Sequence, residues 1–289
     1  MTTPFIAVDW GTTNRRIFHI GADGSVTARV TDDRGVLTVR DFPAEVAALR
    51  AAAGETPLLL AGMIGSNRGW VEVPYVEAPA GLAEVAAGAV AVAAAVHIIP
   101  GVLLADPVRP DVMRGEEVQI IGALAMGAIA DGLVCLPGTH TKWVEIETAQ
   151  IIRFRTVMTG DLMAALKARS ILSDLLDHDP ACDTAFADGV DHSLESPDLT
   201  AELFGARARV LTGMMTPADA ASRISGLLIG ADVRTGLGRG RADVVPLIGA
   251  PALCERFALA LRRAGRESIV IDGEAAFVAG ARAIIAELP

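Results

Sequence analysis

Hydrophobic runs at the start of the chain alternate with short turn-forming stretches. The segment FIAVDWGTTNRRIFHI predicts a buried strand over residues 5–9, a tight turn at Gly11 and a second strand over residues 15–20. GADG then marks another turn, and SVTARVT a third strand. One carboxylate, Asp9, therefore stands at the tip of the first strand, just before a glycine and two threonines.

The same order of elements returns in the middle of the chain. GLVCLPGTHTKWVEIETAQIIRFRTV predicts a strand, a Gly-Thr turn and two more strands, before a helix. The turn over residues 138–142 matches the turn over residues 11–15 in spacing, and a basic residue closes each. We interpret the two stretches as a duplicated supersecondary unit.

Helical and strand patterns alternate along the remaining sequence. Helices are predicted over residues 42–53 and from Glu116 onward. A further, largely helical stretch is predicted from Asp161 to about Arg241, broken by loops around residues 177–183 and 195–197. Two strand–turn–helix units follow to the C-terminus. The Ala-rich stretch after Leu82 predicts a helix and a short strand, VHIIPG, rather than a membrane span, since Glu84 and His97 interrupt it. This alternation indicates an α/β fold.

Composition narrows the function. The 289 residues allow one large domain or two smaller ones, and the net charge of −10 comes without any dense Lys/Arg run. Three separated cysteines form neither a disulfide framework nor a zinc pattern, which suits a reducing compartment. The N-terminus lacks the pattern of a secretion signal. We therefore expect a cytoplasmic protein that binds neither nucleic acid nor membrane.

The two Gly-Thr turns carry the first candidate chemistry. A hairpin tip built from glycine and hydroxyl residues presents N–H and O–H donors to a phosphate. The carboxylate of Asp9 can bind Mg²⁺, which bridges phosphate oxygens. Facing hairpins would hold a nucleoside triphosphate, although each alone could be an ordinary turn. The candidate phosphate ligands are Gly11, Thr12, Thr13, Gly138, Thr139, His140 and Lys142. Neither a Walker A motif nor G-x-G-x-x-G occurs.

Two further clusters suit a polar substrate. The stretch VMRGEEVQIIGAL places two acids, Glu116 and Glu117, at the predicted start of a helix. These acids could simply stabilise the helix by interacting with its dipole. Alternatively, Glu116 could act as a general base toward a substrate hydroxyl. Arg114 beside it could bind a carboxylate or phosphate. AGMIGSNRGWVEVPY combines small polar groups with flat rings, which suit a sugar-like ligand or simply a packed loop. Its candidates are Ser66, Asn67, Arg68, Trp70 and Tyr75.

The hairpins, the α/β order and the missing P-loop resemble the actin-like ATPase superfamily of sugar kinases, hexokinases and Hsp70 chaperones. Within it, the sequence resembles the 2-dehydro-3-deoxygalactonokinase family in AVDWGTTNRR, AGMIGSN, VMRGEE, PGTHTKWV, FRTVMTGDL and SGLLIGAD. These motifs extend from Ala7 to Asp232, and the C-terminal end also matches. The chain departs from the superfamily pattern at Leu136, which replaces the second hairpin's acid and leaves Asp9 as the metal ligand.

The resemblance implies a two-domain actin-like, ribonuclease H-like fold with a nucleotide cleft between the domains. Residues 1–113, completed by a helix over 275–289, would form one domain and residues 114–274 the other. The implied activity is ATP-dependent phosphorylation of the 6-hydroxyl of 2-dehydro-3-deoxy-D-galactonate in galactonate catabolism, with ATP and Mg²⁺ as cofactors. The turn at Gly249 and Ala250 would hold the adenosine.

The resemblance also implies residue roles. Glu116 is the expected base by its likeness to the EEA helix of exopolyphosphatases, and Asp161 in MTGDL is the alternative. The substrate carboxylate needs a cation or N–H donors, and Arg16, Arg68 and Arg114 are the candidates. The sugar acid is expected beside Asn14, Ser66, Asn67 and Glu116.

Several alternatives stay open at this point. The same fold could serve a kinase for a related acid such as 2-dehydro-3-deoxygluconate, a phosphohydrolase of the exopolyphosphatase type, or a nucleotide-driven binding protein. The sequence does not distinguish the galacto from the gluco acid, which differ at one hydroxyl. It also leaves the oligomeric state open, and the apolar Ala-rich segment would suit either a core or a homodimer interface.

Overall fold

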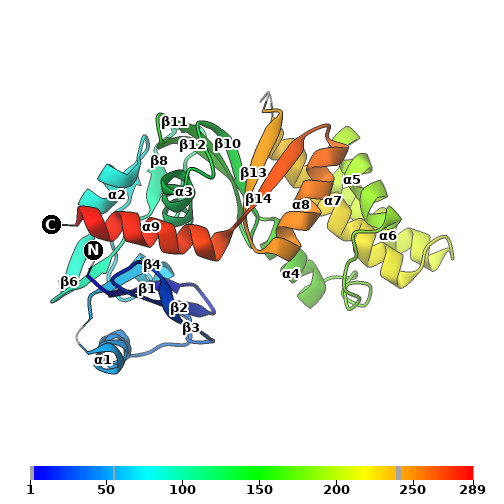
Figure 1. Ribbon diagram of the computed structural model, residues 1–289. Coiled ribbons are helices and arrows are strands. Elements are labelled where there is room, and N and C mark those ends of the chain that lie inside the picture. The colour runs from blue at the N-terminus through cyan, green and yellow to red at the C-terminus, as the bar shows by residue number, and fades with distance from the viewer. Residues whose placement is uncertain (1–2, 55, 239–241, 289) are drawn as a thin grey trace. The chain divides into compact units, whose positions relative to one another are not determined.

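The computed structural model describes residues 3–54, 56–238 and 242–288 (Figure 1). The chain forms two compact units. The first comprises Met1–Asp131, Ile146–Phe154 and Gly273–Pro289, and the second comprises Gly132–Glu145 and Arg155–Asp272. Both units combine strands and helices, so the predicted α/β class is confirmed.

The first unit is built on a six-stranded sheet. Its strands are β1 (Phe5–Trp10), β2 (Arg15–Ile20), β3 (Val26–Asp32), β4 (Leu58–Gly62), β6 (Val90–Ala93) and β7 (Val96–Ile98), in the order β3-β2-β1-β4-β7-β6. Strands β1 and β2 form the predicted antiparallel hairpin, with Trp10 opposite Arg15. Strand β4 pairs with β1 in parallel, so both strands end at the same edge of the sheet.

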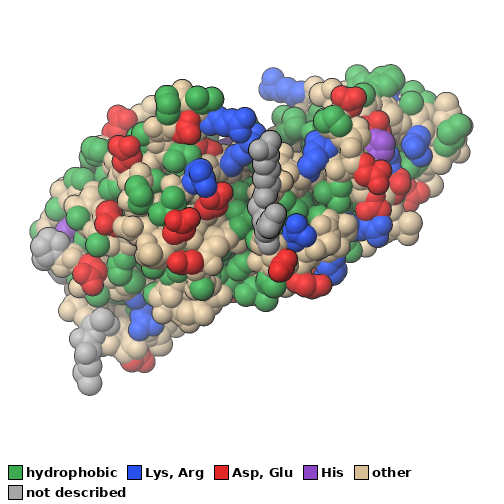
Figure 2. All heavy atoms as spheres, turned by 90° about the horizontal axis from the view of Figure 1, so that it is seen from above, with side chains coloured by type: hydrophobic (Ala, Val, Ile, Leu, Met, Phe, Trp, Pro, Cys, Tyr) green, Lys and Arg blue, Asp and Glu red, His purple; other side chains and the backbone are tan. Residues whose placement is uncertain are grey.

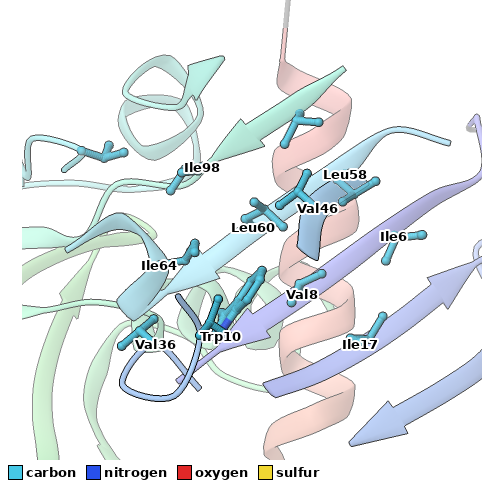
Figure 3. Close-up of a cluster of buried hydrophobic side chains, with 13 residues drawn as sticks. Ile6, Val8, Trp10, Ile17, Val36, Val46, Leu58, Leu60, Ile64 and Ile98 are labelled. Atoms are coloured by element: carbon cyan, nitrogen blue, oxygen red, sulfur yellow. The ribbon is translucent and has the colours of Figure 1, made fainter. Parts of the chain in front are cut away.

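Buried aliphatic side chains of this sheet form the core of the first unit, with Trp10 among them (Figure 3). The predicted helix over residues 42–53 is α1 (Phe42–Ala53). The side chain of Asp41 caps it by accepting from the Ala44 N–H (2.9 Å), and Gly54 ends it in the left-handed conformation. The Phe42 ring packs edge-on against Trp10. The helix therefore rests on the core through Phe42, Val46 and Leu49.

Helix α3 (Glu116–Ala125) belongs to the first unit because it packs on α9 (Gly273–Glu287). The two backbones meet at glycines: a Cβ on Gly122 would lie 1.8 Å from the Ala276 carbonyl oxygen, and a Cβ on Gly280 would lie 1.9 Å from that of Val118. The predicted boundary at residue 113 assigned α3 to the other domain. The structure places α3 in the first unit instead. The sequence did not indicate this, because the contacts between α3 and α9 join segments more than 150 residues apart.

Shorter elements complete the first unit. They are the 3-10 helix η1 (Met63–Gly65), α2 (Leu82–Ala87), and a small sheet of β5 (Val76–Glu77), β8 (Val102–Leu104) and β9 (Asp111–Met113). The Ala-rich stretch is helical only to Ala87, and Val90–Ala93 forms β6 instead. Val90 and Val92 pack against the core of this unit, and β-branched residues favour a strand.

The second unit repeats the strand order of the first. Its sheet contains β10 (Gly132–Leu136), β11 (Thr141–Glu147), β12 (Gln150–Val157), β13 (Val244–Gly249) and β14 (Glu267–Asp272), in the order β12-β11-β10-β13-β14. The part of β11 and β12 within Ile146–Phe154 belongs to the first unit. Strand β13 pairs with β10 in parallel, as β4 does with β1. The predicted duplication is thus present in the topology.

Helices make up the rest of the second unit. They are α4 (Thr159–Arg169), α5 (Thr184–Glu195), α6 (Leu199–Leu211), α7 (Pro217–Leu237) and α8 (Pro251–Arg263). Helix α7 is buried continuously from Ala220 to Val233, which makes it the central helix of this unit. Its N-cap is Thr216, which accepts from the Asp219 N–H (3.1 Å).

The surface carries mixed charge. Acidic and basic side chains are interspersed with hydrophobic ones on the face shown in Figure 2. Of the three cysteines, Cys135 and Cys254 are buried and Cys182 is exposed, and all three are free. None of the described helices has the length and hydropathy needed to cross a membrane.

Candidate functional site

The first Gly-Thr turn is a four-residue hairpin loop supported from behind. The Gly11 N–H donates to the Asn14 carbonyl oxygen (2.9 Å) and closes the loop. The backbone N–H groups of residues 35–37 donate to the carbonyl oxygens of Thr13, Gly11 and Thr12 at 3.0–3.2 Å. The side chains of Thr12, Thr13 and Asn14 remain exposed at the tip. The loop is therefore rigidly held and presents hydroxyl groups outward.

Asp9, directly below this tip, lies in a cluster of charges. Its carboxylate forms an ion pair with Arg16, its partner across the β1–β2 pair. Burial raises the pKa of Asp9, the Arg16 guanidinium lowers it, and the carboxylates of Glu116 and Glu274 raise it further. Arg16 Nη1 also lies 3.9 Å from the Glu274 carboxylate. Arg29 Nη2 pairs with the same Glu274 carboxylate (2.5 Å), so two guanidiniums lie among three acids, and the excess acid suits a cation.

The paired acids at the start of α3 have different environments. Glu117 is fully buried, and both its oxygens accept from the Gly115 N–H (2.7 and 2.8 Å). Burial, together with the Glu116 carboxylate, raises the pKa of Glu117 to about 8. Glu116 is only partly buried and accepts from the Arg114 N–H (3.0 Å). Glu117 therefore anchors the helix start, and Glu116 is the more exposed of the two acids.

Two glycines bring the start of α3 to the end of β1. A Cβ on Gly115 would lie 3.4 Å from the Cα of Gly62, at the end of β4. A Cβ on Gly62 would lie 3.4 Å from Asp9 Oδ1. Both residues have positive φ, of 113° and 86°, which favours glycine at each. The metal candidate Asp9 and the base candidate Glu116 are consequently neighbours.

Two of the three candidate arginines for the substrate carboxylate are engaged within the protein. Arg16 is held by Asp9. The Arg114 guanidinium stacks over the Tyr75 ring (4.2 Å to its centroid), and its Nη2 donates to the Val73 carbonyl oxygen (2.9 Å). The Arg68 side chain is exposed, and within the described part of the chain its guanidinium makes no hydrogen bond or ion pair. Arg68 is thus the most available cation of the three.

The rest of the loop after β4 divides into supporting and exposed residues. The Ser66 hydroxyl donates to the Met63 carbonyl oxygen (2.7 Å) and accepts from the Arg68 N–H (3.2 Å), so it shapes the turn. Trp70 packs against the core of the first unit. Asn67 is exposed. Ser66 and Trp70 therefore hold the loop, while Asn67 and Arg68 are open to a ligand.

In the second unit, the hairpin loop over residues 137–140 is supported by the start of α4. The Asp161 N–H donates to the Thr139 carbonyl oxygen (3.0 Å), and a Cβ on Gly160 would lie 2.7 Å from the carbonyl oxygen of Gly138. The side chains of Thr139 and His140 are exposed, with His140 Nε2 4.0 Å from Asp161 Oδ2. The base candidate Asp161 therefore stands beside this hairpin.

Gly249 and Ala250, the predicted adenosine turn, lie at the junction of β13 and α8. A Cβ on Gly249 would lie 3.3 Å from the carbonyl oxygen of Pro137. The structure thus brings this turn next to the second hairpin. The two stretches are more than 100 residues apart in sequence.

The basic residues that close the two turns point into the protein. Lys142 is buried, and its Nζ donates to Thr156 Oγ1 (2.7 Å) in the adjacent strand. Arg15, at the matching position, is also buried and forms ion pairs with Asp32 and Glu45. Both residues therefore support their hairpins from inside the protein. Because the Lys142 ammonium group points inward, it does not present itself to a phosphate, in contrast to the prediction.

Sequence reasoning missed three supporting features. Glu274 carried only the signal of an acid at a helix start, and its contact with Arg16 depends on the placement of α9. Residues 35–37 support the first hairpin through backbone groups, which have no side-chain signature. Asp232 was part of a recognised motif, SGLLIGAD, without an assigned role.

The charge cluster fits Mg²⁺. This ion is usually bound through one or two carboxylates together with substrate phosphates and water. Asp9 supplies one carboxylate at the foot of an exposed hydroxyl-bearing tip, and Glu116 lies nearby. In the described ranges, no group of three or more Asp, Glu, His or Cys side chains could enclose a metal ion. The protein thus offers a partial site that a bound phosphate would complete.

Comparisons with known proteins indicate one family. A family model described as 2-keto-3-deoxy-galactonokinase matches residues 9–284. A 2-dehydro-3-deoxygalactonokinase of Escherichia coli (strain K12) is 34% identical, with 98% of each chain covered. A probable 2-dehydro-3-deoxygalactonokinase of Rhizobium meliloti (strain 1021) is 38% identical, covering 97% of this chain and 96% of the relative.

Solved structures lead to the same family. A Sinorhizobium meliloti protein, assigned to the same activity, has a crystal structure similar to this chain with a TM-score of 0.91, 37% identity and 97% of each chain covered. More distant structures, at 11–12% identity and TM-scores of 0.52–0.54, share the actin-like ATPase fold. The chain therefore belongs to the 2-keto-3-deoxy-galactonokinase family of actin-like sugar kinases.

Proposed function

We propose that this protein transfers the γ-phosphoryl group of ATP to the 6-hydroxyl of 2-dehydro-3-deoxy-D-galactonate. Membership of the family supports this reaction, as do the names of its relatives. The observation that carries the proposal is the proximity of Asp9 and Glu116 beneath the Gly-Thr hairpin. It combines a metal-binding carboxylate, phosphate donors and a partly exposed base, which are the groups that phosphoryl transfer requires.

The nucleotide would be bound by backbone and hydroxyl groups. In the first unit the donors would be Thr12 and Thr13, while Gly11, whose N–H already donates to the Asn14 carbonyl oxygen, closes the turn. In the second unit they would be Gly138, Thr139 and His140, with Gly249 and Ala250 at the adenosine. The rigid support of both hairpins favours this role, because prearranged donors lose little entropy on binding. A structural relative of low identity, the activator of 2-hydroxyisocaproyl-CoA dehydratase from Clostridium difficile, was solved with bound ADPNP.

Asp9 would hold Mg²⁺. When bound, this ion neutralises phosphate charge as it develops on the transferring group. Arg16 would then separate from Asp9 and could share the Glu274 carboxylate, which lies 3.9 Å from Arg16 Nη1 and already pairs with Arg29. The remaining chemistry belongs to the side chains of the protein and to the substrates.

Glu116 would act as the general base. Its carboxylate takes the proton from the 6-hydroxyl, whose oxygen forms a bond to the γ-phosphorus while the bond to the bridging oxygen of ADP breaks. The partial burial of Glu116 and its place beside Asp9 support this assignment. Asp161 is the alternative, since it is exposed beside the second hairpin.

Arg68 would bind the substrate carboxylate, with Asn14 and Asn67 as further ligands for its hydroxyl groups. An exposed guanidinium without a partner in the described part of the chain can form a bidentate pair with a carboxylate. Arg114 and Tyr75 would support the loop that carries Arg68, since their stacking fixes its far end.

A coupled ADP-release assay tests the proposal. The acceptors are 2-dehydro-3-deoxy-D-galactonate, its gluconate-derived epimer, glucose and none. Turnover with the deoxy sugar acids alone supports the kinase, and the ratio of their kcat/KM values gives the stereospecificity. Equal turnover without an acceptor would instead establish a phosphohydrolase, in which water is the nucleophile. ADP release with none of the four would contradict the proposed substrate.

A further inference from the structure

Asp232 is a buried acid to which the proposed reaction assigns no role. It lies on α7, within the continuously buried stretch of that helix, and its side chain is fully buried. Burial raises its pKa to about 6, while hydrogen bonds from Thr159 and Trp143 lower it. A buried carboxylate is unfavourable unless its oxygens are hydrogen-bonded. Its presence in the core of the second unit therefore calls for a role that an apolar residue could not fill.

The carboxylate joins three segments of the second unit. Oδ1 accepts from the indole Nε1–H of Trp143 in β11 (2.7 Å), and Oδ2 accepts from the hydroxyl of Thr159. The Thr141 hydroxyl also lowers the pKa of Asp232 but makes no hydrogen bond of ordinary geometry. Asp232 consequently ties α7 both to the strand that leaves the second hairpin and to the first residue of α4.

Both ties lead directly to the hairpin tip. Trp143 stands two residues beyond Thr141, where β11 begins after the loop. Thr159 is followed by Gly160 and Asp161, which contact the backbone of residues 138–139. The loop is thus held on one side by β11 and on the other by α4, and Asp232 binds a residue of each.

Packing fixes the indole, so the carboxylate has a defined partner. One turn beyond Asp232 on α7, a Cβ on Gly236 would lie 1.9 Å from the Trp143 ring. The ring therefore lies directly on the α7 backbone. This contact holds the face of the Trp143 ring against α7. The hydrogen bond to Asp232 then fixes the direction in which the indole N–H points.

We propose that Asp232 is a positioning residue that sets the geometry of the second phosphate hairpin through Trp143 and Thr159. It touches neither nucleotide nor sugar acid. This inference rests on the proposed function, because it takes residues 138–140 to bind the phosphates of ATP. It deepens that function by assigning part of the nucleotide affinity to a residue on the central helix of the second unit.

The test measures the Kd for Mg·ATP by titration calorimetry, together with KM for each substrate and Tm. Asp232→Ala is expected to weaken ATP binding by about tenfold or more, the effect of losing a buried hydrogen bond to a charged group. KM for the sugar acid should change by less than about twofold, since that ligand contacts other residues. Asp232→Asn should restore most of the affinity, because its amide accepts from Trp143 and donates to the Thr159 oxygen.

Two more variants keep the proposal falsifiable. Ile224→Ala removes a buried side chain of α7 that lies in a separate apolar cluster. It should lower Tm and leave the Kd for Mg·ATP unchanged. Trp143→Phe keeps a ring against Gly236 but removes the N–H, and it should weaken ATP binding in the same direction as Asp232→Ala. This variant decides the question if Asp232→Ala does not fold.

An unchanged Kd in folded Asp232→Ala or in Trp143→Phe would overturn the proposal. So would an equal loss of affinity in Ile224→Ala, since the effect would then follow from destabilisation alone. Failure of the proposed function shows in the wild-type protein, which would bind Mg·ATP without transferring phosphate to an acid. Failure of the inference shows only in the variants.

Discussion

The carboxylate of Asp9 is paired with the guanidinium of Arg16, directly across the β1–β2 hairpin. This pair neutralises an acid whose pKa is raised by burial, and the carboxylates of Glu116 and Glu274 surround it. Negative charge therefore concentrates below the exposed tip of Thr12 and Thr13. Under the proposed function, Asp9 is the residue on which metal binding, and hence phosphoryl transfer, would depend most.

Asp9→Asn should lower kcat by about a hundredfold or more, since stabilisation of charge by a metal contributes several kcal/mol to a transition state. Titration of activity with MgCl₂ should show a raised metal requirement. Asp23→Asn provides the control, because Asp23 is an exposed turn residue of the same unit that bonds to Ser25. Full activity of Asp9→Asn at ordinary Mg²⁺ concentrations would remove Asp9 from the site.

Glu116→Gln should reduce kcat by about 10²–10⁴-fold, the usual contribution of a general base, with little change in KM for ATP. Single-turnover kinetics with saturating ATP isolate this step. Asp161→Asn serves as the comparison, because it removes the alternative base. If Asp161→Asn abolishes turnover while Glu116→Gln remains active, the roles of the two acids are reversed.

Glu117→Gln should change the pH dependence of stability rather than the chemistry. The pKa of Glu117 is raised by burial from 4.5 to about 8, so the folded state binds a proton that the unfolded state has already lost. The free energy of unfolding therefore falls as pH rises through this window, by up to about 1.4 kcal/mol per pH unit. Denaturant titrations should be carried out at intervals of about one pH unit between pH 5 and pH 8. The free energy of unfolding should depend less steeply on pH in Glu117→Gln than in the wild-type protein. An unaltered slope would show that Glu117 does not titrate there.

Arg68→Ala should raise KM for the sugar acid by about 10–100-fold, since hydrogen bonds to charged groups contribute about 1.5–3 kcal/mol. KM for ATP should stay constant. Arg109→Ala is the matched control, because Arg109 is also exposed and lies on another loop of the first unit. If Arg68→Ala leaves KM for the acid unchanged while Arg16→Lys or Arg114→Lys raises it selectively, the arginine changed in that variant binds the substrate carboxylate instead.

Gly122→Ala should destabilise the first unit by about 1–3 kcal/mol or more, because a Cβ would lie 1.8 Å from the Ala276 carbonyl oxygen. Gly205→Ala is the matched helical control, since the nearest atom to its Cβ is 3.8 Å away and belongs to the flexible Glu202 side chain. That variant should gain about 0.5–1 kcal/mol from helix propensity. Equal free energies of unfolding for the two variants would contradict the packing of α3 on α9.

Local patterns were sufficient for much of the fold. The hairpins, the helix over residues 42–53 and the repeated strand order follow from neighbouring residues. Contacts between distant segments had no such signal. The sequence alone could not separate buried Glu117 from accessible Glu116, because that difference depends on the packing of α3 against α9. The inward orientation of Lys142 likewise depends on Thr156 in the next strand.

The central claim is tested most directly by the ³¹P NMR spectrum of the product formed from Mg·ATP and 2-dehydro-3-deoxy-D-galactonate. The 6-hydroxyl is a primary alcohol, so transfer to it gives a phosphomonoester signal split into a triplet by the two protons on C6. We predict this triplet together with stoichiometric ADP. A doublet would place the phosphate on a secondary hydroxyl, and inorganic phosphate alone would identify a phosphohydrolase; either result would contradict the account.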